Sequence, residues 1–192
     1  MRVITGKYKG RHFDIPRTFK ARPTTDFAKE NIFNVLMQYV DFDGATALDL
    51  FAGTGSITLE MLSRGCQQVV SVELDRDHHR FITDCLKKLG DHACLPIRGD
   101  VFRFVKSCHQ QFDFIFADPP YALEQLGTLP DLIVGASSPI TSHSSLLAPD
   151  GVFVLEHGKD YDFSQHPHFV EHRSYGSVNF SLFSSGVKEL RS

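Results

Sequence analysis

An acid, two prolines and an aromatic residue follow directly on an apolar run of the chain. FDFIFA, residues 112–117, is succeeded by Asp118, Pro119, Pro120 and Tyr121. One proline is enough to end a strand, so a simple turn is the competing interpretation, but it leaves the acid and the aromatic unexplained. The Asp118 carboxylate and the Pro119 carbonyl, which the prolines fix in direction, can accept both hydrogens of a planar amine. With the Tyr121 ring stacked on the base, the motif predicts a catalytic site that orients an exocyclic base amine for attack.

Acids and glycines also end other apolar runs of the chain. The carboxyl ends of parallel strands meet at one edge of a sheet, where α/β proteins bind their ligands. We therefore predict a single ligand site there, formed by Asp49, Phe51, Ala52, Gly53, Thr54, Gly55, Glu73, Leu74, Asp100 and Val101. Acids that merely cap the following helices would explain each carboxylate singly, but not the whole set.

The residue types at this edge favour a nucleoside ligand without phosphates. Glu73 can accept both hydroxyls of a ribose, and Asp100 can accept the amino group of an adenine. Thr58 occupies the third glycine position of the dinucleotide fingerprint, and the chain has no Gly-x-x-x-x-Gly-Lys phosphate cradle. S-adenosylmethionine fits these conditions, because it carries a nucleoside and a sulfonium methyl group that an amine can attack.

Alternating strands and helices are predicted to position these residues. Apolar runs at 45–51, 67–74, 93–100 and 111–117 predict strands, and helical spacing recurs between them. This order predicts an α/β fold, with a mostly parallel sheet and helices on both faces. Pro96 places the third strand at an edge or at a bulge. Beyond a strand at 151–158, two runs joined tightly around Gly176 must pair antiparallel, so the last strand is reversed.

The N-terminal part of the chain is basic, whereas the remainder is acidic. Residues 1–29 hold eight Lys and Arg against two acids. We expect a basic arm or β-hairpin over residues 1–22, packed on a domain of residues 23–192, and a helix capped by Thr25 or Asp26. Such asymmetry predicts a nucleic-acid contact through Arg2, Lys7, Lys9, Arg11, Arg22 and Lys29. A solvated surface that happens to be basic is the alternative.

The composition excludes several classes of protein. No apolar run approaches the roughly 20 residues that span a bilayer, and the first residues lack the apolar core of a signal peptide. We therefore expect a cytoplasmic protein. Its four cysteines form no Cys-x-x-Cys pair, and its histidines lack partners at ligand spacing, so we predict reduced thiols and no metal site.

Three stretches resemble class I S-adenosylmethionine-dependent methyltransferases that act on exocyclic amines: ALDLFAGTGSITLEMLSRG, VVSVELDRD and FIFADPPY. The N-terminal GKYKGR and RPTTD narrow this resemblance to the RsmD family, bacterial guanine-N2 methyltransferases of small-subunit (16S) ribosomal RNA. LLAPDGVFVLEHGK and YGSVNFSLF are similar to that family too, so the resemblance covers nearly the whole chain.

The resemblance implies a Rossmann-like seven-stranded sheet with its last strand antiparallel. It implies further that the Asp118–Tyr121 motif holds a guanine, and that Glu73 and the Asp49–Gly55 loop hold S-adenosylmethionine. One position departs from the family. Phe27 stands where a basic residue is usual, and we expect Lys29 to compensate for a phosphate contact there.

Two alternative functions stay open on the sequence. An adenine-N6 DNA methyltransferase uses the same acid-Pro-Pro-aromatic motif, although a minimal domain better suits a base already exposed in structured RNA. A non-catalytic RNA-binding or ribosome-assembly protein on the same fold would not need the intact motif. A dinucleotide-dependent oxidoreductase is disfavoured by Thr58. We expect a monomer that acts on 16S ribosomal RNA, within an assembled small-subunit particle.

Overall fold

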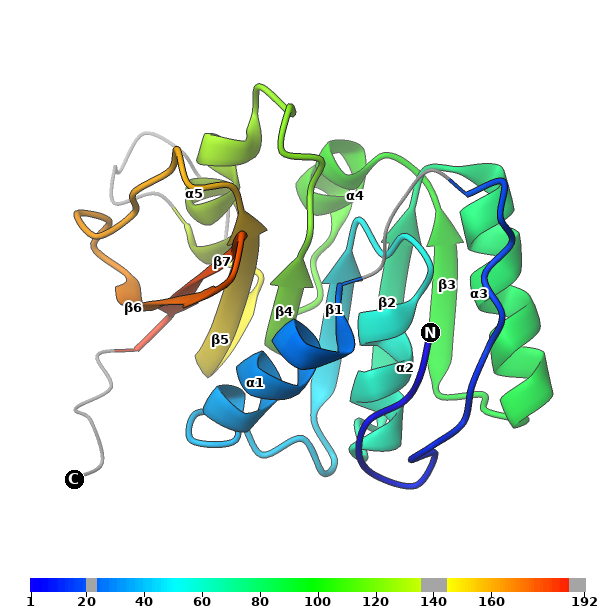
Figure 1. The fold of residues 1–192 in the computed structure, drawn as a ribbon. Helices are drawn as coiled ribbons and strands as arrows, with labels where there is room; N and C mark the ends of the chain where they lie inside the picture. Colours follow the sequence, from blue (N-terminus) through cyan, green and yellow to red (C-terminus); the bar gives the residue numbers. More distant parts are fainter. Residues whose placement is uncertain (20–23, 136–144, 187–192) are drawn as a thin grey trace.

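A computed structural model describes residues 1–19, 24–135 and 145–186 of the chain (Figure 1). Helices and strands alternate through most of it, as the sequence predicts. Their bounds are α1 Asp26–Leu36, β1 Thr46–Leu50, α2 Ser56–Ser63, β2 Gln68–Glu73, α3 Arg76–Leu89, β3 Cys94–Arg98, α4 Val101–Ser107, β4 Phe112–Ala117, the 3₁₀ turn η1 Leu126–Thr128, α5 Leu129–Val134, β5 Leu147–His157, β6 Phe169–Tyr175 and β7 Val178–Ser184. The helix α5 was not expected, and the polar loop predicted at 137–145 lies almost wholly outside the described residues.

The strands form one seven-stranded sheet in the order β3-β2-β1-β4-β5-β7-β6. β7 runs antiparallel to both β5 and β6, and the other neighbouring pairs are parallel, so the reversed last strand is confirmed. β3, which contains Pro96, is an edge strand, also as predicted. Strand order reverses between β1 and β4, and such a switch point is where open α/β sheets bind ligands.

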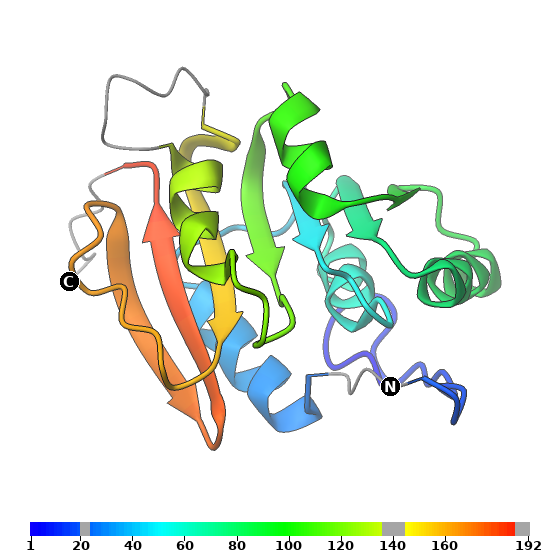
Figure 2. The ribbon, with the colours of Figure 1, turned by 90° about the horizontal axis from the view of Figure 1, so that it is seen from above.

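Helices cover both faces of this sheet (Figure 2). Side chains alternate between the faces along each strand, so Phe114 and Phe116 of β4 pack with α1 and α2, whereas Ile115 packs with α4 and α5. The Thr25 side chain caps α1 by accepting a hydrogen bond from Ala28 N at 3.2 Å. Among the described residues, none of the helices has the length and apolar character needed to cross a membrane.

The N-terminal segment forms a single β-bridge, between Arg2 and His12, and not the two strands of a hairpin. It is tied to α2 instead, because the Glu60 carboxylate accepts from Ile4 N at 2.8 Å and from Thr5 N at 3.0 Å. Gly6 has φ +90°, and a Cβ on it would lie 1.8 Å from the carbonyl oxygen of Ser63. Only glycine fits this close approach. The boundary predicted at residues 22/23 lies outside the described residues.

The structure contradicts the predicted role of Lys29 as an RNA contact. Its side chain is 1% exposed, and its Nζ donates to the carbonyl oxygen of Arg2 at 2.6 Å and to Ser56 Oγ at 3.0 Å. The Glu60 carboxylate lies 3.8 Å away. Burial lowers the pKa of Lys29, an effect that Glu60 partly offsets. Lys29 therefore joins the N-terminal segment to α1 and α2, and cannot reach a phosphate.

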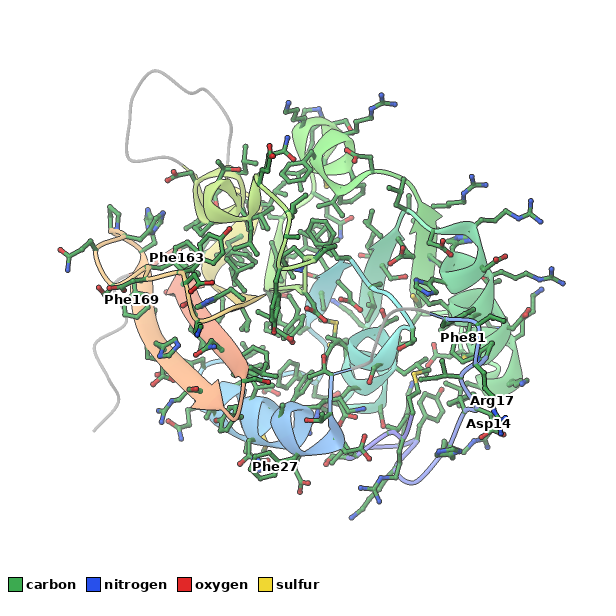
Figure 3. The ribbon with its side chains drawn as sticks, turned by 45° about the horizontal axis from the view of Figure 1, so that its top comes forward. Asp14, Arg17, Phe27, Phe81, Phe163 and Phe169 are labelled. Atoms are coloured by element: carbon green, nitrogen blue, oxygen red, sulfur yellow. The ribbon has the colours of Figure 1, made fainter. Side chains whose placement is uncertain are left out.

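Phe27, by contrast, lies on the outer side of α1 and points to solvent (Figure 3). Its side chain is 66% exposed and meets Tyr175 edge to face, with ring centroids 6.2 Å apart. Lys29 therefore does not compensate for the basic residue that the resemblance implies at this point, and Phe27 presents an exposed aromatic side chain there.

Candidate functional site

A cavity of about 1110 Å³ opens at the carboxyl ends of the central strands, the upper edge of the sheet in Figure 1. It brings together both groups of residues that the sequence indicated. Nine of the ten predicted cofactor residues line it, and so do all four residues of the predicted catalytic motif: Asp49, Phe51, Ala52, Gly53, Thr54, Glu73, Leu74, Asp100, Val101, Asp118, Pro119, Pro120 and Tyr121. A ligand bound near β1 and β2 therefore shares one space with a base bound near β4.

The register of the sheet places a further acid, Glu156, beside Asp118. Parallel pairing joins Phe116 to Val154 and Ala117 to Leu155, so the next positions on β4 and β5 are Asp118 and Glu156. Neighbouring strands lie about 4.8 Å apart, and side chains at equivalent positions share a face. Glu156 is 5% exposed and lines the cavity, so the structure adds to the motif a second carboxyl that the sequence analysis missed.

Two hydroxyl groups hold the Glu156 carboxylate in place. Tyr121 Oη donates to Glu156 Oε1 at 3.0 Å, and Thr24 Oγ1 donates to Oε2 at 3.4 Å. The Tyr121 side chain is 44% exposed, and its ring lies 3.5 Å from where a Cβ on Gly158 would stand. The tyrosine is thus anchored at its hydroxyl, while its exposed ring lines the cavity as a stacking surface requires.

The carbonyl groups of the two prolines differ in what they contact. The Pro120 carbonyl accepts from Leu123 N at 2.8 Å and so belongs to the turn after β4. The Pro119 carbonyl accepts no hydrogen bond from the part of the chain that the structure describes. Pro119 itself is buried and lines the cavity. The geometry thus leaves Pro119 oxygen as an acceptor for a ligand.

The carboxyls at this edge of the sheet bind protons more tightly than usual. Burial, and next the charge of Glu156, raise the pKa of Asp118 well above its ordinary value. Burial also raises the pKa of Glu156, although hydrogen bonds from Tyr121 and Thr24 oppose the shift. Two adjacent carboxyls cannot both ionise easily, so the pair favours holding one proton between them.

Asp49, at the end of β1, is a further carboxyl of the cavity and is 1% exposed. Burial raises its pKa to about 7, although Thr58 Oγ1 donates to Asp49 Oδ2 at 2.5 Å. A cation in the cavity would lower that pKa again, since an opposite charge favours the ionised form. A ligand with a positive charge, such as a sulfonium or an ammonium group, therefore fits the neighbourhood of Asp49.

Glu73 connects the end of β2 to the loop after β1. Its Oε2 accepts from Gly53 N at 2.7 Å, and its Oε1 accepts from Asp75 N at 2.8 Å. Each carboxylate oxygen has a second lone pair, so Glu73 can still accept the two hydroxyls of a ribose. Asp100 caps α4 through its Oδ1, which accepts from Arg103 N at 2.9 Å, and it lines the cavity as well. The capping interpretation thus holds for Asp100 alongside the ligand interpretation.

The two glycines of the loop have different roles. A Cβ on Gly53 would meet no atom closer than 3.9 Å and would project where the residue borders the cavity. Gly55 is absent from the lining; it is the N-cap of α2 with φ +77°, and a Cβ on it would lie 2.8 Å from Ile82 Cγ1. Gly55 therefore packs against α3, and its contact with a cofactor stays a prediction.

These features together fit S-adenosylmethionine. Glu73 suits the ribose, Asp49 suits the cationic end, and apolar side chains around Val101 suit an adenine. One of these, Phe102, was missed in the sequence; its ring lies 6.3 Å from that of Phe51, and both rings border the cavity. Its position directly after Val101 was the available signal.

Two basic residues of the N-terminal segment, Lys7 and Arg11, lie away from the cavity. The Lys7 ammonium pairs with Asp91 at 3.0 Å, beyond the end of α3, and Arg11 donates to the Lys88 carbonyl at 3.3 Å. α3 begins at the cavity and has 14 residues, so at 1.5 Å per residue these cations lie about 20 Å from it. Arg2 pairs with Asp26 at 3.2 Å, Lys9 is exposed, and Arg22 lies outside the described residues. Their contact with RNA stays a prediction.

Comparisons with known proteins agree with this geometry. Residues 1–184 match the family described as "Conserved hypothetical protein 95". The chain is 36% identical over 170 residues to the "Putative rRNA methyltransferase YlbH" of Bacillus subtilis, covering 86% of each protein. It is 28% identical over 195 residues to "Ribosomal RNA small subunit methyltransferase D" of Haemophilus influenzae, covering 96% of this chain and 94% of the relative. The solved structure of the "Putative methyltransferase yhhF" of Escherichia coli has the same fold, with a TM-score of 0.80 at 24% identity over 96% of this chain and 97% of that one.

Proposed function

The chain belongs to the family described as "Conserved hypothetical protein 95", and from this premise we propose that it methylates the exocyclic N2 amine of a guanine in small-subunit (16S) ribosomal RNA. S-adenosylmethionine is the methyl donor. The observation that carries the proposal is the shared cavity, in which the Glu73 and Asp49 end joins the motif from Asp118 to Tyr121.

The residues of the motif hold the amine for attack. The Asp118 carboxyl and the Pro119 carbonyl accept the two hydrogens of the guanine N2 group, and the Tyr121 ring stacks on the base. Two acceptors on one NH2 group favour the tetrahedral nitrogen of the transition state. Orientation of this kind accounts for up to about 7–11 kcal/mol of a barrier.

S-adenosylmethionine, when bound, supplies an electrophilic methyl group on a sulfonium centre. As the nitrogen–carbon bond forms, the carbon–sulfur bond breaks and its electron pair stays on sulfur. The N2 nitrogen then carries a surplus proton. The Asp118–Glu156 pair can accept that proton, because the raised pKa of both carboxyls makes them better bases than ordinary ones.

The names of the relatives support ribosomal RNA as the substrate class, since the Haemophilus influenzae relative is named for the small subunit. We take an assembled small-subunit particle as the substrate, and a monomer in the cytoplasm as the acting form. A base exposed on such a particle does not have to be extruded from a duplex by the enzyme, which suits a domain of this size.

The test is a methylation assay with labelled S-adenosylmethionine on small-subunit particles, on naked 16S RNA and on DNA, followed by nucleoside analysis. We expect N2-methylguanosine in 16S RNA, and its loss at one position in ribosomal RNA from cells that lack the protein. N6-methyladenine in DNA as the main product would replace this proposal with the adenine alternative. Absence of S-adenosylmethionine binding in calorimetry would instead favour the non-catalytic assembly protein.

A further inference from the structure

Glu156 is a titratable group at the reacting end of the cavity that lies outside the Asp118–Tyr121 motif. Its carboxyl is 5% exposed, lies beside Asp118 in the register of β4 and β5, and borders the same space. The hydroxyls of Tyr121 and Thr24 hold both of its oxygens. An explanation of this fixed, buried carboxyl lies in the chemistry of the ligand that the cavity binds.

Two neighbouring carboxyls that are both ionised repel each other, and burial raises the pKa of each, so a proton shared between Asp118 and Glu156 stabilises the pair when no base is bound. A ligand that displaces this proton must bring hydrogen-bond donors of its own, because two unprotonated carboxylates at neighbouring positions repel each other. The pair is therefore complementary to an edge with adjacent N–H groups.

The edges of the purines differ in this respect. Guanine presents the N1–H and the N2 amine side by side, both of them donors. Adenine and 2-aminopurine have an amine beside an N1 that carries a lone pair and no hydrogen. A carboxylate that faces such a lone pair meets electrostatic repulsion, whereas opposite guanine it gains a hydrogen bond.

We propose that Glu156 is the residue that selects guanine, by accepting the N1–H while Asp118 and Pro119 hold the N2 amine. This inference rests on the proposed function and names its specificity determinant. Each oxygen of Glu156 accepts one hydroxyl in the structure, and the second lone pair on each leaves capacity for the N1–H. The guanine edge takes the place of the shared proton, which is released to solvent when the base binds.

The test compares RNA substrates that differ only at the methylated position, once mass mapping has located it. One substrate carries guanine there and the other carries 2-aminopurine, which keeps the N2 amine but lacks the N1–H. We expect the wild-type protein to prefer guanine by about 10²-fold or more in kcat/KM, since a site built to bind an N–H strongly rejects an analogue without it. Equal rates on the two substrates would overturn the inference without any variant.

2-Aminopurine lacks the O6 oxygen of guanine as well as the N1–H, so the comparison of substrates does not test the N1 contact alone. The variant Glu156→Gln does, because it changes the residue that would face N1. Its amide nitrogen can donate to an unprotonated N1, so we expect the guanine preference to fall by about tenfold or more. Glu124→Gln, an exposed position in the turn after the motif, is the matched control and should keep the wild-type ratio. Calorimetry with S-adenosylmethionine checks that both variants are folded.

The outcomes separate this inference from the proposed function. Methylation of guanine N2 in RNA with an unchanged preference in Glu156→Gln would refute the role of Glu156 alone. Absence of any RNA methylation by the wild-type protein would refute the proposed function and the inference with it.

Discussion

Replacement of Asp118 by alanine tests the division of the cavity into a cofactor end and a reacting end. Asp118 follows β4, whereas the residues suited to S-adenosylmethionine follow β1, β2 and β3. We therefore expect Asp118→Ala to change the dissociation constant of S-adenosylmethionine by less than about threefold, a shift of less than about 0.7 kcal/mol.

Turnover should respond very differently. A hydrogen bond to a charged group contributes about 1.5–3 kcal/mol, which alone corresponds to a factor of about 10 to 150 in rate. The variant also lacks one of the two acceptors that orient the amine, and removal of such a preorganised group costs about 10²–10³ in kcat in other enzymes. We expect kcat to fall by about 10²–10³, and by less in Asp118→Asn, which keeps one acceptor oxygen.

Single-turnover methylation of 16S RNA with labelled S-adenosylmethionine measures the rate, and calorimetry measures the binding. Asp162→Ala, on an exposed side chain, is the control for the removal of a surface acid. A variant at Asp118 with wild-type turnover would refute the role assigned to this carboxyl. A loss of rate explained wholly by weaker cofactor binding would refute the division of the cavity.

Three further predictions concern the cofactor end, the N-terminal segment and its charges. Burial raises the pKa of Asp49 to about 7, and a cationic ligand favours the ionised form of this carboxyl. The affinity of the wild-type protein for S-adenosylmethionine, measured by calorimetry, should therefore rise between pH 5 and pH 8. In Asp49→Asn it should stay flat over this range. Gly6→Ala should lower the free energy of unfolding by about 2–4 kcal/mol in denaturant titrations, because the new Cβ would clash with α2. Gly10 has a similar φ, but a Cβ on it would meet no atom within 4 Å, so Gly10→Ala should lower that free energy by only about 1 kcal/mol. Equal losses in the two variants would contradict the clash. Charge reversal at Lys9 and Arg11 should weaken RNA binding and reduce the slope of log affinity against log salt by about 0.7–0.9 for each phosphate that is no longer neutralised, and an unaltered slope would assign these cations to a solvated surface.

The sequence predicted the parts of the fold that depend on local patterns. Apolar runs bounded by acids and glycines located the first four strands, and the short link at Gly176 correctly required an antiparallel pair. The acids Asp49 and Glu73 were found because they end such runs, and strand ends meet at one edge of a parallel sheet. Local periodicity and turn chemistry were therefore sufficient for the alternation of strands and helices, for the antiparallel end of the sheet and for most of the cavity, whereas the number of strands came from the family resemblance.

Other features depend on contacts between distant segments, which local patterns do not encode. Lys29 lies among charged residues early in α1, so its burial against Glu60 and the Arg2 carbonyl was not foreseen. Glu156 lies near the end of an apolar run, and its importance follows only from the register of β5 against β4. The distance of Lys7 from the cavity likewise follows from its pairing beyond α3.

Three carboxyls of the cavity, Asp49, Asp118 and Glu156, share one face of the sheet, and this placement links its two halves. Asp49 follows Ala47, Asp118 follows Phe116 and Glu156 follows Val154 by two positions, and all three of these apolar residues pack in the layer of α1 and α2. Burial alone would make such a row unfavourable when ionised. A cationic methyl donor near Asp49 and a base edge with two donors near Asp118 and Glu156 compensate it at both ends. The neighbouring carboxylates that destabilise the unliganded cavity thus favour a positively charged cofactor and a guanine amine. They disfavour ligands that carry neither a positive charge nor a hydrogen-bond donor.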